Sequence, residues 1–256
     1  RRLNLAGNVM MVMIIPIAVA THSVVSWIFG LTYRSGWDST IFAPYFVVGA
    51  LYSGTAMLIT MMFIFRRFYR LEEFLTLRHF QLLATLLVVF GTAYAYFTFA
   101  EYLTVAYKLE SADKALLEEL FFGRYAPLVW FGFVGGQIVP VIVAAIPRTR
   151  TIEILFVASI LANIGMWIKR LIIVVPSLSE PLLPTSWGVY TPAAVEVLIT
   201  LASFAGFALI ITVFAKFFPI ISFEEMAEGW EHEIDKSRPV NLGTPETFAN
   251  PAGGGQ

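Results

Sequence analysis

The sequence contains no cysteine and only three histidines among its 256 residues. Without cysteine the chain forms no disulfide bond, and it cannot itself ligate an iron–sulfur cluster or a thiolate zinc site. A six-coordinate b-type haem takes two axial ligands, and only His22 lies deep in an apolar segment. We therefore expect no haem, cluster or metal site in this chain, and any redox function would pass electrons to another subunit.

Charged residues are also scarce. They make up 14% of the chain, whereas 58% of the residues are hydrophobic and the mean hydropathy is +0.75. Soluble domains carry about 25% charged residues, and one small globule cannot bury this excess of apolar side chains. The formal net charge of −1 provides no general attraction to nucleic acid. The composition therefore predicts a membrane protein.

Six apolar stretches are long enough to cross a bilayer, since a spanning helix takes roughly 20 residues. We predict an all-α integral membrane protein whose residues 1–220 form a bundle of about six transmembrane helices. The expected spans are residues 5–31, 41–65, 79–107, 127–146, 152–176 and 193–219. Residues 221–256 mix charge with Gly and Pro, and we predict an extramembrane cytoplasmic tail there. The first apolar run is too long for a signal peptide and no small-residue cleavage site follows it, and we expect further helices upstream of Arg1.

The basic residues predict the orientation of these spans, because cytoplasmic loops are enriched in Lys and Arg. One side of the membrane would carry Arg1, Arg2, Arg66, Arg67, Arg70, Arg78, Arg148, Arg150, Lys216, Lys236 and Arg238. The other side would carry only Arg34, Lys108, Lys114 and Arg124. We therefore expect both ends of this chain on the cytoplasmic side.

A few ionisable groups lie within the apolar stretches or at their ends, where they are costly and often functional. They are His22, Glu101, Lys169, Arg170 and Glu196, with Asp38 just beyond the first span. Counted at 1.5 Å per residue, all of them fall toward the outer face of the membrane. Hydropathy alone does not require this common depth, so we regard the group as a candidate site.

Structural roles for the same residues stay open. Lys169 could extend its ammonium group to the outer interface, and Arg170 could pair with Glu101 to hold two helices together. Gln137 lies in the middle of the fourth span among several glycines, which would let helices approach closely. Pro140 would kink that span and free a backbone carbonyl.

A lipid-soluble quinol is a ligand that this set of residues suits. Its flat ring fits an aromatic and aliphatic slot, and each of its two hydroxyls needs an acceptor that can take a proton. A histidine and a carboxylate serve both needs, since each can accept the hydrogen bond and then the proton. A site at outer depth would release the protons outside.

Several segments resemble the NrfD-type family, the membrane subunits of polysulfide reductase and related complexes. They are THSVVSW (21–27), GWDSTIFAPYFVVGALYSG (36–54), FAEYLTVAY (99–107), NIGMWIKRLIIVVPSL (163–178) and LLPTSWGVY (182–190). Within the family, the chain is most similar to ActC and its paralogue ActF, the quinol-binding membrane subunits of bacterial alternative complex III. The resemblance covers about residues 5–225.

The resemblance implies oxidation of menaquinol or a similar quinol near the outer face, as part of an oxidoreductase complex of the bacterial cytoplasmic membrane. Electrons would pass to an adjacent iron–sulfur subunit, and further partners would be a homologous second membrane subunit and c-type cytochrome subunits. His22 and Asp38 would be catalytic, and Glu101, Arg170, Trp37 and Tyr102 would complete the quinol site. The same positions suggest a proton path through Glu101, Lys169, Arg170 and Glu196.

Two positions depart from the family pattern. Relatives often carry an acid where Ile28 stands, and a glutamate where Lys169 stands. Both changes remove acids that could carry protons across the membrane, so they weigh against a proton path more than against a quinol pocket.

Two alternatives in the same complex stay open: a membrane anchor without redox chemistry, and a proton-path paralogue. A secondary transporter is disfavoured, because the two halves show no convincing repeat and the charges lie away from the midplane.

Overall fold

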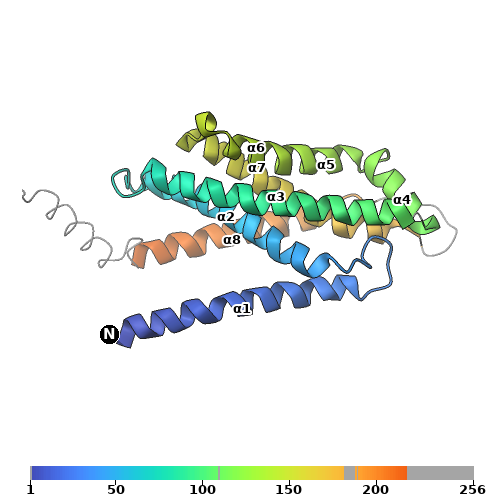
Figure 1. Ribbon diagram of the computed structural model, residues 1–256, viewed down its shortest axis with the longest axis horizontal. Helices are drawn as coiled ribbons and strands as arrows, with labels where there is room; N and C mark the ends of the chain where they lie inside the picture. Colours follow the sequence, from blue (N-terminus) through green and yellow to red (C-terminus); the bar gives the residue numbers. More distant parts are fainter. Residues whose placement is uncertain (1, 109, 182–187, 189, 218–256) are drawn as a thin grey trace, which may run out of the picture. The chain divides into compact units, whose positions relative to one another are not determined.

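The computed structural model describes residues 2–108, 110–181, 188 and 190–217 (Figure 1). All regular structure in this part of the chain is helical, and it falls into two compact units, Arg1–Tyr190 and Thr191–Gln256. The second unit holds α8 (Ala194–Phe217). The first holds α1 (Arg2–Gly30), α2 (Phe42–Phe68), α3 (Leu77–Lys108), α4 (Ser111–Phe121), α5 (Ala126–Trp130), η1 (Phe131–Ile138), α6 (Val139–Ala145), η2 (Pro147–Thr149) and α7 (Ile152–Ser179).

The six predicted membrane spans are confirmed as helices of sufficient length and apolarity. They are Leu5–Gly30, Phe42–Phe68, Leu77–Lys108, Ala126–Ala145, Ile152–Ser179 and Ala194–Phe217. Their ends differ from the prediction by a few residues, because polar residues at a membrane surface can continue a helix while their side chains reach water. The predicted tail after residue 220 and most of the motif 182–190 lie outside the described residues.

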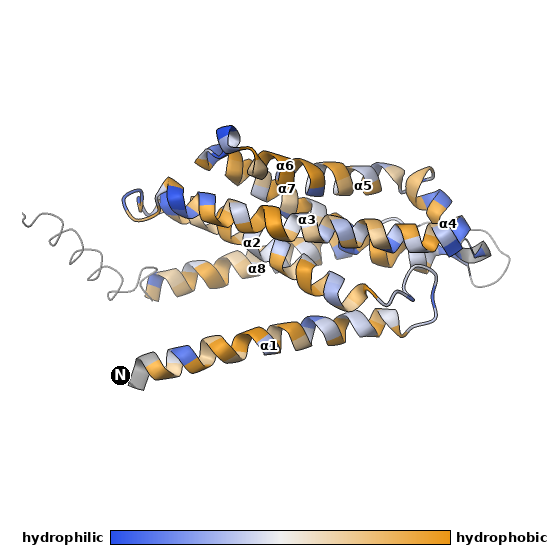
Figure 2. Ribbon diagram, in the orientation of Figure 1, coloured by the Kyte–Doolittle hydropathy of each residue, from blue (hydrophilic) through white to orange (hydrophobic). Residues whose placement is uncertain are grey.

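Hydrophobic residues make up most of the length of these helices, whereas hydrophilic residues gather toward the helix ends (Figure 2). The run Met10–Ile15 of α1 is an example, with side chains that are 54% to 72% exposed. Such a surface is unfavourable in water and suits contact with lipid. The chain is therefore a multi-pass membrane protein.

The contact between α2 and α3 follows a repeat of seven residues. On α2 the stripe consists of the buried residues Phe42, Tyr45, Gly49, Tyr52, Ala56 and Ile59, with Thr55 buried beside it, and on α3 it consists of Phe80, Ala84, Leu87, Gly91, Tyr94, Thr98 and Glu101. Alternating steps of three and four residues keep one stripe facing a neighbouring helix, as in antiparallel bundles. Glu101 occupies the last position of the α3 stripe, so the packing that buries the aromatic core also turns this carboxylate inward.

The fourth span is interrupted as Pro140 predicted, but by a π-helical segment. η1 lies between α5 and α6, and the missing N–H of Pro140 deprives the carbonyl of Gly136, four residues earlier, of its α-helical donor. The hydroxyl of Tyr52 on α2 donates to this carbonyl at 3.1 Å. The break in the helix is thereby satisfied from a neighbouring helix, as buried backbone in a membrane requires.

Two glycines set the distance between η1 and α7. A Cβ atom added at Gly165 would lie 2.3 Å from the Cα of Gly136, and one added at Gly136 would lie 2.2 Å from the Cα of Gly165. Backbone faces backbone here, so no flexible side chain can move aside. This is the close helix approach that small residues permit in membranes.

Replacing Gly165 by alanine should therefore lower the stability of the assembled protein by about 1–3 kcal/mol, the usual cost of overpacking. Gly54→Ala is the matched control, because a Cβ at Gly54 would meet no atom within 4 Å. Thermal unfolding in detergent would measure both variants. Equal midpoints for the two would show that η1 and α7 can separate without cost.

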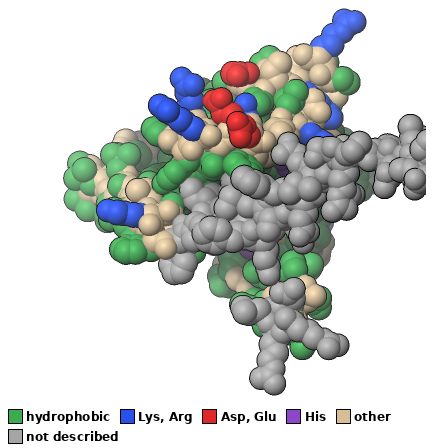
Figure 3. Space-filling model, turned by 90° about the vertical axis from the view of Figure 1, so that its left-hand side faces the viewer, with side chains coloured by type: hydrophobic (Ala, Val, Ile, Leu, Met, Phe, Trp, Pro, Cys, Tyr) green, Lys and Arg blue, Asp and Glu red, His purple; other side chains and the backbone are tan. Residues whose placement is uncertain are grey.

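The helix connections of the first unit define two ends. The basic end carries Arg66, Arg67, Arg70, Arg78, Arg148 and Arg150 in and beside the α2–α3 and α6–α7 connections, and Lys and Arg side chains are prominent in the view of this end (Figure 3). The acidic end carries four carboxyl groups: Asp38 in the α1–α2 connection, Glu110 just before α4, Asp113 within α4, and Glu180 after α7.

The helix α4 is not among the predicted elements, since residues 108–126 were expected to form only a connection between spans.

Candidate functional site

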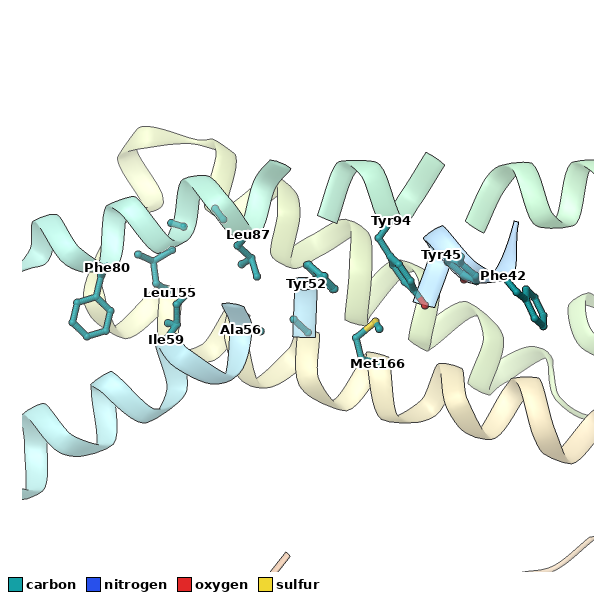
Figure 4. Close-up of a cluster of buried hydrophobic side chains, with 13 residues drawn as sticks. Phe42, Tyr45, Tyr52, Ala56, Ile59, Phe80, Leu87, Tyr94, Leu155 and Met166 are labelled. Atoms are coloured by element: carbon teal, nitrogen blue, oxygen red, sulfur yellow. The ribbon is translucent and has the colours of Figure 1, made fainter. Parts of the chain in front are cut away.

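A stack of three tyrosines occupies the core between α2 and α3 (Figure 4). The rings of Tyr45 and Tyr94 stack with centroids 4.7 Å apart, and those of Tyr52 and Tyr94 lie 6.0 Å apart. The hydroxyl of Thr98 donates to the carbonyl of Tyr94 at 2.9 Å, so it accepts from the hydroxyl of Tyr45, also at 2.9 Å. The stack is thus held in one orientation by both packing and hydrogen bonds.

A buried ion pair lies at the acidic end of this stack. The ammonium group of Lys169 donates to Glu101 Oε2 at 3.1 Å and to the hydroxyl of Tyr102 at 2.8 Å. It also lies 4.4 Å from the ring centroid of Tyr102 and 5.5 Å from that of Tyr45. The side chains of Lys169 and Glu101 are only 12% and 8% exposed, so each charge depends on the other for its stabilisation.

This pairing decides structural roles that the sequence had left open. Lys169, and not Arg170, is the partner of Glu101, and the lysine ammonium does not extend to the interface. The reason is the register of α7, where Leu155, Ala162 and Met166 face the core with the same spacing as on α3. Position 169 continues that stripe and position 170 turns away from it, which leaves Arg170 exposed.

His22 and Arg170 line one hollow of about 450 Å³, which we name the His22 hollow. Its walls come from α1, α2, α3 and α7, and they include Phe29, Tyr45, Phe46, Gly49, Ala50, Tyr94, Met166 and Lys169. The hollow is therefore mostly apolar and aromatic, with a histidine and two basic groups in its wall. Its volume lies within the range of about 300–1,000 Å³ typical of small-molecule sites.

The hydrogen bond of His22 defines which ring nitrogen is available. Its Nδ1 lies 2.8 Å from the carbonyl oxygen of Ala18 on the same helix. A carbonyl only accepts, so Nδ1 carries the proton, and in the neutral ring Nε2 is left with a lone pair. The side chain is thus prepared to accept a proton from a ligand at Nε2.

Asp38 lies in a neighbouring hollow and not in that of His22. This second hollow of about 330 Å³, the Asp38 hollow, is lined by Asp38, Glu101, Tyr102, Lys108 and Asp113 among others. Lys169 belongs to the wall of the His22 hollow and its partner Glu101 to the wall of the Asp38 hollow. The ion pair therefore forms part of the partition between the two spaces.

Trp37 holds the α1–α2 connection against α7. Its indole N–H donates to the carbonyl of Ile173 at 2.7 Å, and its ring meets Phe29 edge to face with centroids 5.0 Å apart. Ile173 lines both hollows. Trp37 thus orders the wall between them, and its indole N–H is already engaged with the protein.

Arg34 satisfies the free carbonyls at the end of α7. Its guanidinium donates from Nε to Ser177 at 2.8 Å, and from Nη2 to Leu178 at 3.1 Å and Glu180 at 2.8 Å. The last carbonyls of a helix lack intrahelical donors and carry partial negative charge, so a cation is favourable there. This contact connects the α1–α2 loop to α7 across the acidic end.

Two carboxyl groups at the acidic end have raised pKa values. Burial raises the pKa of Asp113 above its ordinary value, as do the nearby charges of Asp38 and Glu110, while a hydrogen bond from the Gly36 backbone acts in the opposite direction. Burial likewise raises the pKa of Glu180, against the effects of Ser35 and Arg34. Both groups therefore retain a proton to higher pH than free side chains would.

The structure brings some of the sequence-predicted residues together and separates others. His22 and Arg170 share one hollow with Lys169, and Asp38, Glu101 and Tyr102 share the next. Glu196 lies in the first turn of α8, in the second compact unit. The sequence did not reveal Asp113 or the tyrosine stack as parts of the site. A spacing of seven residues separates Tyr45 from Tyr52 on α2. The same spacing separates Tyr94 from Glu101 on α3, and it indicates residues that share one face of a helix.

Comparison with known proteins places the first compact unit in a described family. The family described as "Polysulphide reductase, NrfD" matches residues 2–181. A relative from Halobacterium salinarum, described as a "Putative dimethyl sulfoxide reductase membrane subunit", is 30% identical in an alignment that covers 80% of this chain and 52% of the relative. The chain therefore spans about half the length of the curated relative that it matches.

Proposed function

Because the chain belongs to the NrfD polysulphide reductase family, we propose that it is the quinol-oxidising membrane subunit of an electron-transfer complex. Membership of this family supports a membrane subunit within an oxidoreductase complex. We propose that a quinol, such as menaquinol, binds in the His22 hollow. The observation that carries it is the half-buried His22, with a free Nε2 lone pair, in an aromatic hollow of about 450 Å³.

Oxidation of a quinol releases two electrons and two protons. In the proposed reaction, one hydroxyl gives its proton to His22 Nε2, since Nδ1 already donates to Ala18. The ammonium group of Lys169 passes a proton to the carboxylate of Glu101, and the other quinol hydroxyl replaces that proton on Lys169. Glu101 lines the Asp38 hollow, so the proton leaves the quinol on that side. The chain has no cysteine to ligate an iron–sulfur cluster, so the two electrons would leave for an adjacent subunit, which in the proposed complex is an iron–sulfur protein.

We further propose that the complex is a bacterial alternative complex III and that this chain corresponds to ActC or ActF. Its partners are then the iron–sulfur subunit, a homologous second membrane subunit and c-type cytochromes. The chain lies in the cytoplasmic membrane with the basic end at the cytoplasm, as the distribution of Lys and Arg favours. The acidic end then faces outside and receives the protons.

Filling the His22 hollow tests the proposal without changing its polar groups. Ala50 lines this hollow, whereas the next residue of α2, Leu51, is 45% exposed. Ala50→Trp should raise the KM for quinol by about tenfold or more, because the indole occupies the space of the ring. The measurement is steady-state quinol oxidation by the intact complex in detergent.

Leu51→Trp is the matched control, since it adds the same side chain on the lipid-facing side and should leave the KM unchanged. If Ala50→Trp also leaves it unchanged, quinol does not bind in this hollow. That result would favour the second candidate function, a proton-path subunit without quinol chemistry. The observation behind this alternative is the buried Lys169–Glu101 pair, which has the character of a proton relay.

A further inference from the structure

Two polar hollows lie in series between the buried ion pair and the acidic end of the first unit. The Asp38 hollow, of about 330 Å³, reaches inward along α3 as far as Glu101 and its neighbour Ala100. A further hollow of about 200 Å³, which we name the Glu180 hollow, is lined by Glu180 and other polar residues of the acidic end. Asp38 and Asp113 line both spaces, so the two hollows meet at these carboxyl groups.

Glu101 presents a free oxygen atom to the Asp38 hollow. Its Oε2 accepts from Lys169, but its Oε1 has no hydrogen-bond partner among the described residues. This oxygen is not fully enclosed either, since the fully enclosed side-chain atom without a partner in this part of the chain is Gln137 Nε2. Glu101 lines the Asp38 hollow and not the His22 hollow, so Oε1 is accessible from the acidic end. A carboxylate oxygen about 10 Å inside the end of α3 requires a hydrogen-bond donor.

Water is the donor that this space provides. A buried water makes about two to four hydrogen bonds, and the polar wall offers them. The hydroxyl of Tyr102 accepts from Lys169, so its own O–H is free to donate to a water that in turn donates to Glu101 Oε1. Tyr102, Asp113 and Ser177 all line the hollow. Its volume of about 330 Å³ has room for several waters, at about 30 Å³ for each.

Asp113 is the second buried carboxyl group on this route. It is 8% exposed, and the backbone of Gly36 donates a hydrogen bond to it. Charged groups face it from each neighbouring segment: Lys108 at the end of α3, Asp38 in the α1–α2 connection, Glu110 just before α4, and Glu180 after α7. Burial and the charges of Asp38 and Glu110 raise the pKa of Asp113 above its ordinary value. A carboxyl group whose pKa is raised toward the ambient pH can both take up and release a proton.

We infer that the Asp38 and Glu180 hollows form a water-filled proton outlet, in which Asp113 relays protons from the water at Glu101 Oε1 to the water outside the acidic end. Glu101 gives the proton that it received from Lys169 to the first water, and Asp113 takes one up from the same file of waters. Asp113 then releases a proton into the Glu180 hollow, so both groups return to carboxylates. The direction of transfer rests on the proposed function, whereas the water-filled hollow does not depend on quinol.

The absence of cysteine from this chain allows a direct test for water in the Asp38 hollow. Ala100→Cys places one thiol in the lining, beside Glu101. The matched control is Leu103→Cys, three residues nearer to the acidic end, on a side chain that is 53% exposed and lines neither hollow. The intact complex, in membrane vesicles of both orientations, is treated with a membrane-impermeant, positively charged methanethiosulfonate, and the mass of this chain is measured.

Ala100→Cys should react about tenfold or more faster than Leu103→Cys, because a thiol ionises and reacts in contact with water but stays inert in lipid. Reaction of Ala100→Cys that is no faster than that of Leu103→Cys, from both sides of the membrane, would overturn the inference. Faster reaction from the cytoplasmic side alone would support the water-filled hollow and contradict the proposed orientation of the chain.

The relay role of Asp113 is tested by Asp113→Asn, which keeps an acceptor for the Gly36 backbone but cannot take a proton. It should slow quinol oxidation by the intact complex about tenfold or more, and Asp113→Glu should retain most of the rate. Glu118→Gln is the control on the same helix, since Glu118 is exposed and lines neither hollow. An Asp113→Asn complex with the wild-type rate would overturn the relay. A wild-type complex that oxidises no quinol, with a reactive Ala100→Cys, would contradict the proposed function and support the water-filled hollow.

Discussion

Replacing His22 by glutamine should slow quinol oxidation by about 10²–10⁴-fold, the usual contribution of a general base. Glutamine can still form a hydrogen bond to a quinol hydroxyl, but it cannot take the proton. Because Nδ1 of His22 donates to Ala18, the ring accepts only at Nε2, and no other histidine of the described residues lines the hollow. The expected change is in kcat, with a smaller change in KM, since binding contacts are largely retained.

The measurement is the rate at which reduced quinol delivers electrons to the first acceptor of the intact complex, followed by stopped flow. His79→Gln is the matched control. His79 lies in the first turn of α3 at the basic end, where it bonds to Thr76, and it lines neither hollow. Its replacement should leave the rate unchanged. A His22→Gln complex that oxidises quinol at the wild-type rate would exclude His22 as the base.

Removing one partner of the Lys169–Glu101 pair should destabilise the protein by about 3–5 kcal/mol, because an uncompensated charge is left in a buried site. Glu101→Gln leaves the ammonium without its carboxylate, and Lys169→Met leaves the carboxylate without its ammonium. The double variant Glu101→Leu, Lys169→Met should regain most of the loss, since buried ion pairs can often be replaced by apolar side chains of similar size.

Thermal unfolding of the intact complex would measure these differences. The pair Lys114–Glu118 on α4 serves as control, because its atoms are 3.9 Å apart and its side chains are 58% and 65% exposed. Glu118→Gln should have little effect on stability, as is usual for surface pairs. If Glu101→Gln is no more destabilising than Glu118→Gln, the buried pair is not held in the geometry described.

The double variant also separates structure from proton transfer. A stable double variant that oxidises quinol slowly, with the rate restored at higher pH, would indicate that the pair carries protons out of the His22 hollow. A stable double variant with the wild-type rate would assign the pair to helix packing alone. In both cases the stability measurement shows that the site itself has survived the substitutions.

The tertiary structure changes how the two candidate proton acceptors, His22 and Asp38, are understood. From the sequence, His22 and Asp38 were expected at opposite ends of one quinol, but Asp38 lies in the hollow beyond the ion pair, with Asp113. Asp113 is placed there by α4 and by a hydrogen bond from the Gly36 backbone, which itself has a positive φ of 76°. The sequence contained these residues, but no local pattern indicated that they meet.

The sequence by itself determined the membrane spans, because they follow from local properties. An apolar stretch of about 20 residues must form a helix in lipid, whatever its neighbours, since its backbone has no other partner there. It also indicated that Pro140 would free a carbonyl. The helices α2, α3 and α7 follow from the same local rule.

Only the tertiary structure decided which groups meet. Lys169 and Arg170 are adjacent and equally charged, and a rotation of about 100° around α7 determines that the first pairs with Glu101 while the second faces the His22 hollow. The donor to the Gly136 carbonyl, and the lack of an acceptor for Gln137 among the described residues, depend likewise on neighbouring helices. Such partnerships are set by the packing of distant segments, because hydrogen bonds and ion pairs act over only a few ångströms.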